Sequence, residues 1–293
     1  MKTNNPFRAM VITLITALSL SCMAVFVKLL AHQVEISQVI LFRFGSGLIY
    51  ILGLALWTRL RDRKISFPPR APFKFHFARA FFGVVSMFFF YSTFKFMPLV
   101  DSTLLMMTAP LFLPIFSWII WRERTSWQVV LAIIFGFIGL VFILRPDSAV
   151  FHQGALWGLG GGAFAALAIL SLKRATLDDP PMTILLCYFP LAVLMSGLVC
   201  LFSWMPLTWH LVLLLLGVGF FGTIYQEGLV RACQYAPPSL VTTVMYTSVV
   251  FSGLLEFFLW DHIPGWNSWI GSLIVCASGS WTVFHLRKSS GKR

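Results

Sequence analysis

Long apolar stretches separated by short polar segments dominate this chain. Each stretch approaches or exceeds the roughly 20 residues that an α-helix needs to cross a hydrocarbon core of about 30 Å. The pattern predicts ten membrane-spanning helices, at about residues 10–31, 36–58, 76–97, 99–121, 126–144, 154–173, 182–203, 210–235, 238–260 and 266–286. Because the connections between them are short, we predict an all-α integral membrane protein without a soluble domain.

A repeated pattern links the two halves of the chain. Residues 97–127 are echoed 139 positions later by residues 236–266, so that Pro98 coincides with Pro237. Each copy belongs to a half with five apolar spans, and an odd number of crossings gives the second half the opposite orientation in the membrane. Inverted repeats of this kind are typical of alternating-access carriers. The predicted units are two inverted five-helix repeats, at residues 1–147 and 152–287, and a basic tail, 288–293.

The basic residues indicate how the helices are oriented. The chain carries 22 Lys and Arg against 10 Asp and Glu, a net charge of +12. If the N-terminus is cytoplasmic, 18 basic residues fall in cytoplasmic segments, Arg43 lies within a span, and only Lys28, Lys95 and Arg145 lie outside. This split follows the positive-inside rule, so we predict that both termini are cytoplasmic. We further expect a multi-pass protein of a bacterial inner membrane. The surplus charge therefore indicates topology rather than a nucleic-acid partner.

Composition narrows the function classes. The chain is 58% hydrophobic and 11% charged, against roughly 25% charged residues in soluble domains. No nucleotide-binding loop, metal-ligand spacing or Ser/His/Asp set is visible in the sequence, so we expect no enzyme activity, no cofactor and no metal. The expected partners are a small-molecule substrate and the lipid bilayer, in a monomer or a homodimer.

Ionisable groups inside the spans are candidate functional residues, because such groups are costly in a bilayer unless they are paired or face water. Arg43 could hold a substrate carboxylate or phosphate, or it could bind backbone carbonyls of a broken helix. Glu227 precedes Arg231 by one helical turn. The two could form an internal ion pair, or Glu227 could be a proton or substrate site.

Polar residues form one stripe along the predicted ninth helix. Thr242, Tyr246 and Glu256 share one helical face, and the equivalent face of the fourth helix carries Thr103 and Met107. Such a face would be poorly placed against lipid, so we predict that it lines a substrate cavity. Glu256 is also a candidate for proton coupling, although its position near the outer end allows it simply to reach interfacial water.

Aromatic residues supply further candidates. The run from Phe88 to Tyr91 covers a whole turn of the third helix, so at least one ring must face the interior. Tyr91 and Tyr188 could stack on a planar substrate, and core packing is the alternative for each ring.

Proline and glycine mark two places where helices should depart from regular packing. Pro110 and Pro114 lie inside the fourth predicted helix and predict a kink or hinge. Gly158 and Gly162 form a small-xxx-small pair that allows another helix to approach closely.

Several motifs together resemble the EamA family of the drug/metabolite transporter superfamily. They are RAFFGVVSMFFFYSTFKFMPLVDSTLLMMTAPLF at 79–112, Glu123, GFIGLVFILRP at 136–146, RACQYAPPS at 231–239, Tyr246, Asp261-x-x-Pro264 and Ser278-Gly279. The resemblance covers almost the whole chain. It implies ten helices in two inverted repeats with the substrate near the membrane middle, and it is strongest to the branch of riboflavin and S-adenosylmethionine carriers. One departure is His262, which stands where the first half has Glu123.

These observations predict a secondary-active transporter of a small polar or amphipathic metabolite that works by alternating access. A planar, aromatic or nucleoside-like substrate, such as S-adenosylmethionine or riboflavin, fits the resemblance. A drug or amino-acid exporter of the same fold is one alternative. A lipid-handling scramblase or a scaffolding membrane protein is an alternative from another class.

Overall fold

The computed structural model describes residues 6–61, 68–122, 151–236 and 244–261, with single positions within 127–139, at 241 and within 265–281. Regular secondary structure in these parts is helical. The helices are α1 (Pro6–Leu30), α2 (Ile36–Leu60), α3 (Phe73–Thr93), α4 (Leu99–Met106), α5 (Ala109–Trp121), α7 (Phe151–Asp178), α8 (Pro181–Cys200), α9 (Trp209–Tyr235) and α11 (Thr247–Trp260). The predicted spans at 126–144 and 266–286 lie largely outside the described residues.

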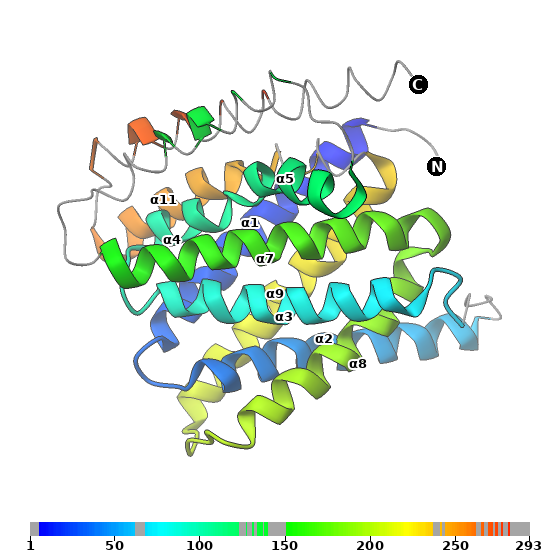
Figure 1. The fold of residues 1–293 in the computed structure, drawn as a ribbon. Coiled ribbons are helices and arrows are strands. Elements are labelled where there is room, and N and C mark those ends of the chain that lie inside the picture. Colours follow the sequence, from blue (N-terminus) through cyan, green and yellow to red (C-terminus); the bar gives the residue numbers. More distant parts are fainter. Residues whose placement is uncertain are drawn as a thin grey trace.

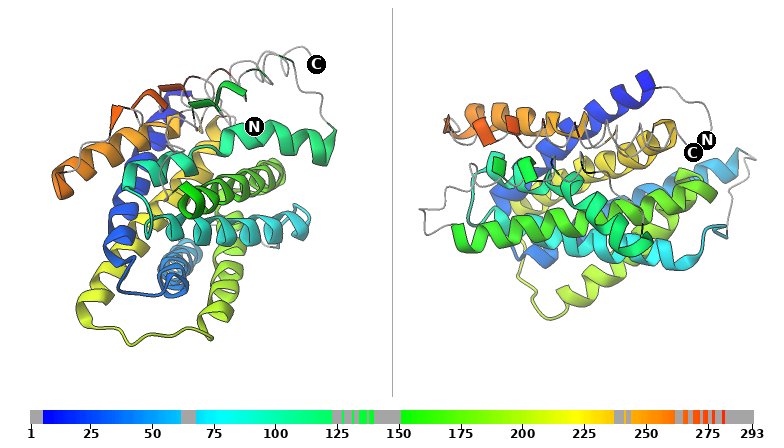
Figure 2. Two further views of the ribbon diagram at one scale, coloured as in Figure 1. Left: turned by 60° about the vertical axis from the view of Figure 1, so that its left-hand side comes forward. Right: turned by 45° about the horizontal axis from the view of Figure 1, so that its top comes forward.

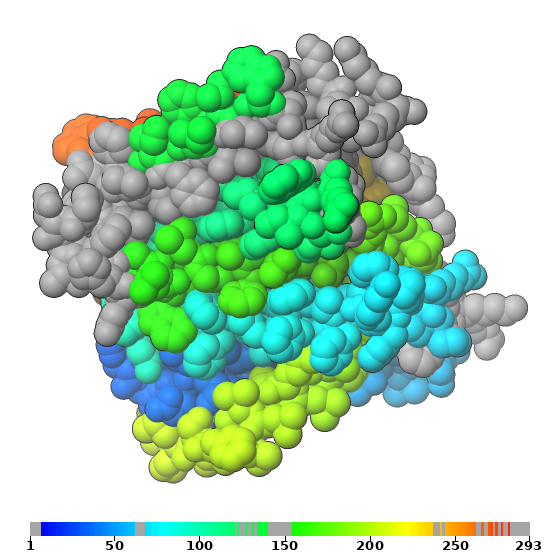
Figure 3. Space-filling view, in the orientation of Figure 1, coloured from blue at the N-terminus to red at the C-terminus, as the bar shows by residue number. Residues whose placement is uncertain are grey.

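Seven segments have the length and apolar composition to cross a membrane, with α4 and α5 together forming one of them. Large apolar side chains also cover the outside of the bundle. The coloured part of the face drawn in Figure 3 includes α3, α5, α7 and α8, and these helices carry exposed residues such as Phe81, Trp118 and Leu198. An exterior with so many large apolar side chains would cause aggregation in water, whereas in a bilayer it faces lipid. The prediction of an all-helical membrane protein is confirmed.

The two halves of the chain are interleaved. α3 packs against α7, α1 against α9, and α2 against both α8 and α9. Figures 1 and 2 show these helices packed side by side in one bundle. We call the end where α1, α3 and α8 finish the Lys28 end (left in Figure 1), and the opposite end, where α3 and α8 begin, the Asp179 end. The interface between the halves therefore runs through the middle of the molecule.

The predicted fourth helix, 99–121, is in fact two helices. α4 ends at Met106, and α5 begins at Ala109 with Pro110 in its first turn. Proline lacks the N–H that would bond to the carbonyl four residues earlier, and its ring crowds that carbonyl, so the helix breaks just before it. A second turn lies at Tyr246, directly before α11, and it follows Met107 by the repeat offset of 139 residues. Pro114, in contrast, is accommodated inside α5.

Two glycines allow α7 to lie close to this break. A Cβ atom on Gly158 would overlap the Leu105 side chain. A Cβ atom on Gly162 would overlap the Thr108 hydroxyl and would lie 3.0 Å from the Leu105 carbonyl oxygen. The small-residue pair read from the sequence thus marks a real close approach, and it brings the second half of the chain against the α4–α5 break.

Candidate functional site

A cavity of about 50 Å³ lies between the two halves of the chain, in the middle of the bundle. Its wall combines α3, α4 and α5 of the first half with α7, α8 and α9 of the second. The lining residues are Arg79, Gly83, Ser86, Met87, Met106, Met107, Ala109, Pro110, Ala165, Ala168, Ile169, Tyr188, Tyr225, Gln226, Leu229 and Met245. Pockets for small molecules usually measure roughly 300–1,000 Å³, so this cavity must widen to admit a metabolite.

Arg79 is the charged residue of the cavity wall. It lies on α3, six residues after the helix begins and therefore about 9 Å along its axis, and its side chain is only 5% exposed. The guanidinium carbon lies 5.1 Å from the centre of the Tyr188 ring, a distance at which a cation is attracted to the ring face. Its Nε has no hydrogen-bond partner among the described residues.

Arg43, on α2, is a second buried guanidinium in the same region. It is 1% exposed, and its guanidinium carbon lies 4.6 Å from the Phe44 ring centre and 5.9 Å from that of Tyr225. Its Nε contacts the Met23 sulfur at 3.4 Å, while neither terminal nitrogen has a hydrogen-bond partner within the described part of the chain. Arg43 does not line the cavity, but Tyr225 lies beside both.

The other polar groups of the cavity are uncharged. Gln226 on α9 is 1% exposed, and its amide nitrogen has no hydrogen-bond partner in the described parts. Ser86 on α3 donates to the Gly161 carbonyl at 2.9 Å and so already has a partner. The unsatisfied groups in the wall are therefore N–H donors.

Four methionines form much of the apolar wall: Met87, Met106, Met107 and Met245. Methionine side chains are unbranched and polarizable, so they adapt to ligands of different shape. The cavity thus combines a cationic, donor-rich part with a deformable apolar part.

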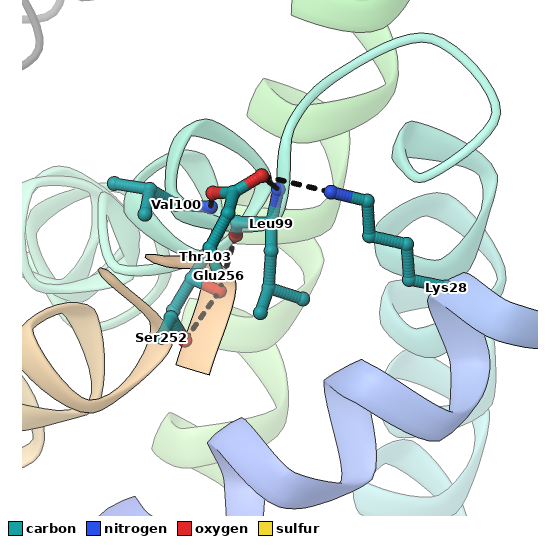
Figure 4. Close-up of polar contacts among 6 residues, drawn as sticks. All are labelled: Lys28, Leu99, Val100, Thr103, Ser252 and Glu256. Atoms are coloured by element: carbon teal, nitrogen blue, oxygen red, sulfur yellow. Dashed lines mark hydrogen bonds and ion pairs between the residues drawn. The ribbon is translucent and has the colours of Figure 1, made fainter. Parts of the chain in front are cut away.

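A buried carboxylate joins the two halves at the Lys28 end of the bundle through residues that do not line this cavity (Figure 4). Glu256 on α11 is 1% exposed and accepts the backbone N–H groups of Leu99 at 3.0 Å and Val100 at 2.9 Å. Lys28 of α1 reaches the same carboxylate at 2.8 Å, and its ammonium also lies 4.5 Å from the Trp260 ring centre. We call this contact the Glu256 clasp.

Hydroxyl groups extend the clasp toward the interior. Thr103 of α4 lies 3.1 Å from Ser252 of α11, and Ser252 lies 3.2 Å from Ser21 of α1. Ser21 also donates to the Ser248 carbonyl at 2.8 Å. Side-chain hydroxyl groups of three helices therefore contact one another at this end.

A second carboxylate joins the halves at the opposite end. Asp179, directly after α7, accepts the backbone N–H groups of Arg70 at 2.7 Å and Ala71 at 3.1 Å. His76 of α3 lies 2.9 Å from the same carboxylate through its Nε2. This Asp179 clasp repeats the composition of the first one: two successive N–H groups and one basic side chain from the first half meet one acid from the second.

Comparisons with known proteins show to which protein family this chain belongs. Residues 7–145 and 152–284 both match the EamA-like transporter family. The chain belongs to this family. It is therefore a transporter rather than an enzyme, and a multi-pass protein of the bacterial inner membrane, as the sequence predicted.

Named relatives of this EamA-like transporter share about a quarter of its residues. Mouse solute carrier family 35 member G1 is 26% identical over 286 residues, covering 91% of this chain and 75% of the relative. A riboflavin transporter of Vibrio cholerae is 27% identical over 224 residues, 75% of each chain. An S-adenosylmethionine uptake transporter of Rickettsia bellii is 24% identical over 284 residues, 96% of this chain and 94% of the relative.

A crystal structure matches the fold of this transporter with a TM-score of 0.64 at 17% sequence identity, covering 96% of this chain and 98% of the other. At this identity the match concerns the fold alone. The resemblance to the EamA family and to its riboflavin and S-adenosylmethionine branch is confirmed by the family match and by the names of the relatives.

The structure brings together part of the set of candidate residues predicted from the sequence of this EamA-like transporter. Met107, Pro110 and Tyr188 line the cavity. Arg43 and Tyr91 are buried beside it, and the Tyr91 hydroxyl lies 3.2 Å from the same Met23 sulfur that Arg43 contacts. Tyr246 is buried at the turn before α11 but does not line the cavity. Thr242 lies outside the described residues.

Other candidates lie elsewhere. Phe88 packs against Trp157, with ring centres 6.1 Å apart, rather than lining the cavity. Thr103 and Glu256 belong to the clasp at the Lys28 end. Glu227 accepts a hydrogen bond from Tyr50 at 2.5 Å and pairs with Arg231, which corresponds to the ion-pair alternative left open from the sequence.

The structure adds four functional candidates that were not predicted from the sequence: Arg79 and Gln226 in the cavity, and Lys28 and Asp179 in the clasps. The charge pattern places Arg79 among the 18 cytoplasmic basic residues, because it follows a polar loop closely. The helix begins at Phe73 rather than near residue 76, so Arg79 lies deeper than the hydropathy pattern indicated.

Proposed function

We propose that this EamA-like transporter carries a small polar or amphipathic metabolite across the membrane by alternating access between its two halves. The cavity between the halves is the proposed substrate site, and the two clasps are the proposed closures. The observation that carries this proposal is that each end of the bundle has one buried carboxylate linking the second half to backbone groups of the first.

Alternating access requires that the cavity open to one side of the membrane at a time. Following the distribution of basic residues, we assign the Lys28 end to the outer side and the Asp179 end to the cytoplasm. The Glu256 clasp then closes the outer side in the described conformation. To open it, the protein must separate α11 from the start of α4 and from Lys28.

This opening provides a route for coupling to protons. If a proton neutralises Glu256, the attraction to Lys28 and the charge-assisted bonds from Leu99 and Val100 weaken. Glu256 is therefore our first candidate for coupling and Glu227, already held by Tyr50 and Arg231, the second. Glu256→Gln should remove the pH dependence of uptake while substrate exchange continues. Unchanged pH-dependent uptake after both glutamates are replaced would rule out coupling through them.

For the substrate, the relatives named as riboflavin and S-adenosylmethionine transporters support a planar or nucleoside-like metabolite. The tyrosines and methionines of the cavity suit such a body. The direct test is counterflow in sealed vesicles that contain the purified protein. We expect saturable uptake of a labelled metabolite that accelerates when the same unlabelled metabolite is loaded inside. Lipid exchange without saturable uptake would instead favour a scramblase.

A further inference from the structure

In the described part of the chain, the buried polar groups of the cavity wall that lack a hydrogen-bond partner are all donors. Arg79 contributes a buried positive charge with an unsatisfied Nε, and Gln226 contributes an unsatisfied amide N–H group. Both are donors, and both are at least nine-tenths buried. No carboxylate side chain lines the cavity within the described residues. A ligand that completes these groups must therefore present acceptors.

The ion pairs among the described residues also indicate a ligand that presents acceptors. The ion pairs that the structure describes are Lys28 with Glu256, His76 with Asp179 and Arg231 with Glu227, and neither Arg79 nor Arg43 belongs to them. A buried cation without a counter-ion costs several kcal/mol, and charged groups that persist inside membrane proteins usually mark a substrate or ion pathway. Tyr188 and Tyr225 offset part of this cost through their ring faces, but they supply no negative charge.

We propose that the cavity binds an organic anion, whose carboxylate or phosphate group pairs with Arg79 and accepts a hydrogen bond from Gln226. The planar guanidinium matches either oxyanion. The apolar body of the ligand lies against the methionine wall and the rings of Tyr188 and Tyr225. Arg43, across Tyr225, adds a second positive charge that favours the same sign of ligand. This inference rests on the proposed function, since it assigns the chemical class of the transported substrate.

The test is a set of probes that differ in charge but share one body. Phenylacetate and phenyl phosphate are the anionic probes, phenylacetamide is neutral, and phenethylamine is a cation. The melting temperature of the detergent-purified full chain is measured with each probe at millimolar concentration, because a ligand that binds the native state raises it. We expect both anions, or one of them, to raise the melting temperature, and the neutral and cationic probes to leave it unchanged.

Variants assign the effect to the cavity. Arg79→Gln should abolish the anion-dependent rise, and Arg59→Gln, which removes an exposed arginine of α2, should retain it. Phosphatidylglycerol is added in a separate sample, because a lipid phosphate could also bind a buried arginine. The proposal is overturned if neither anion raises the melting temperature of the wild type, if the rise persists in Arg79→Gln, or if only the lipid produces it.

Binding in detergent does not require transport. If anions bind through Arg79 but no counterflow of any substrate occurs in vesicles, the transport proposal fails and the anion site stands. If counterflow occurs with a neutral metabolite and anions do not bind, the anion site fails and transport stands.

Discussion

The clasps and the cavity differ in whether the protein itself supplies partners for a buried charge. At each end of the bundle a carboxylate receives two backbone N–H groups and contacts a Lys or His side chain, so its charge has stabilising partners within the protein. In the cavity, Arg79 has an unsatisfied nitrogen and no carboxylate partner among the residues described. A compensated charge holds two helices together, whereas an uncompensated one costs stability until a ligand supplies its partner. Substitutions should therefore have opposite effects in the two regions.

The largest effect is expected at the Glu256 clasp. Glu256→Ala leaves the Lys28 ammonium and two backbone N–H groups unsatisfied in a buried site, and loss of one partner of such a pair costs about 3–5 kcal/mol. We expect a clearly lower melting temperature in detergent. The double variant Lys28→Met with Glu256→Ala should recover part of the loss, because it no longer buries a lone cation. An equal loss in both variants would show that the ion pair contributes little.

A smaller loss is expected at the Asp179 clasp. Asp179→Asn keeps one acceptor oxygen but removes the charge that faces His76 and the N–H groups of Arg70 and Ala71, which should cost about 1–3 kcal/mol. The neighbouring Asp178 is exposed and provides the control, since Asp178→Asn should leave the melting temperature nearly unchanged. If the two variants melt alike, the second clasp does not join the halves.

In the cavity, we expect a substitution to raise the stability of the protein rather than to lower it. Arg79→Met removes an uncompensated buried cation and replaces it with a side chain that matches the methionine wall, so the ligand-free protein should gain on the order of 1 kcal/mol of stability. The exposed Arg59 serves again as control, and Arg59→Met should change the melting temperature little. A loss of stability in Arg79→Met would place Arg79 among the structural residues.

The smallest effect should come from the hydroxyl groups behind the clasp. Ser252→Ala removes the contacts to Thr103 and Ser21 but no charge, and a neutral hydrogen bond contributes about 1 kcal/mol. The melting temperature should fall less than in Asp179→Asn. A fall as large as that of Glu256→Ala would mean that the hydroxyl groups, rather than the carboxylate, hold this end closed.

Much of the fold could be predicted because hydropathy is a local property of the sequence. The helix positions follow from it directly, and Pro110 indicated the irregular fourth helix, although not that the chain breaks at Met107 and Thr108. Glu256 could be placed near the end of its helix from its position alone. Its partners could not be predicted, because Lys28 is 228 positions away along the chain.

The cavity was harder to predict for the same reason. Tyr188 could be identified as a candidate aromatic residue and Met107 from its place in the repeat, but Arg79 resembled the basic residues that flank the preceding loop. The available signal was that Arg79 is separated from that loop by nearly two helical turns and is followed by a long apolar run. Gln226 offered no signal beyond being a polar residue within a span.

The central claim is that the cavity opens alternately to the two sides and that the Glu256 clasp closes one of them. Ala165, a small residue of the cavity wall, can be changed to cysteine in a background without other cysteines. The measurement is its rate of labelling by an impermeant thiol reagent added outside sealed, right-side-out vesicles. The account predicts slow labelling with Glu256 in place and labelling roughly tenfold faster or more in Glu256→Gln, as expected when about 1.4 kcal/mol or more of closure is lost. Equal rates in the two proteins would contradict it.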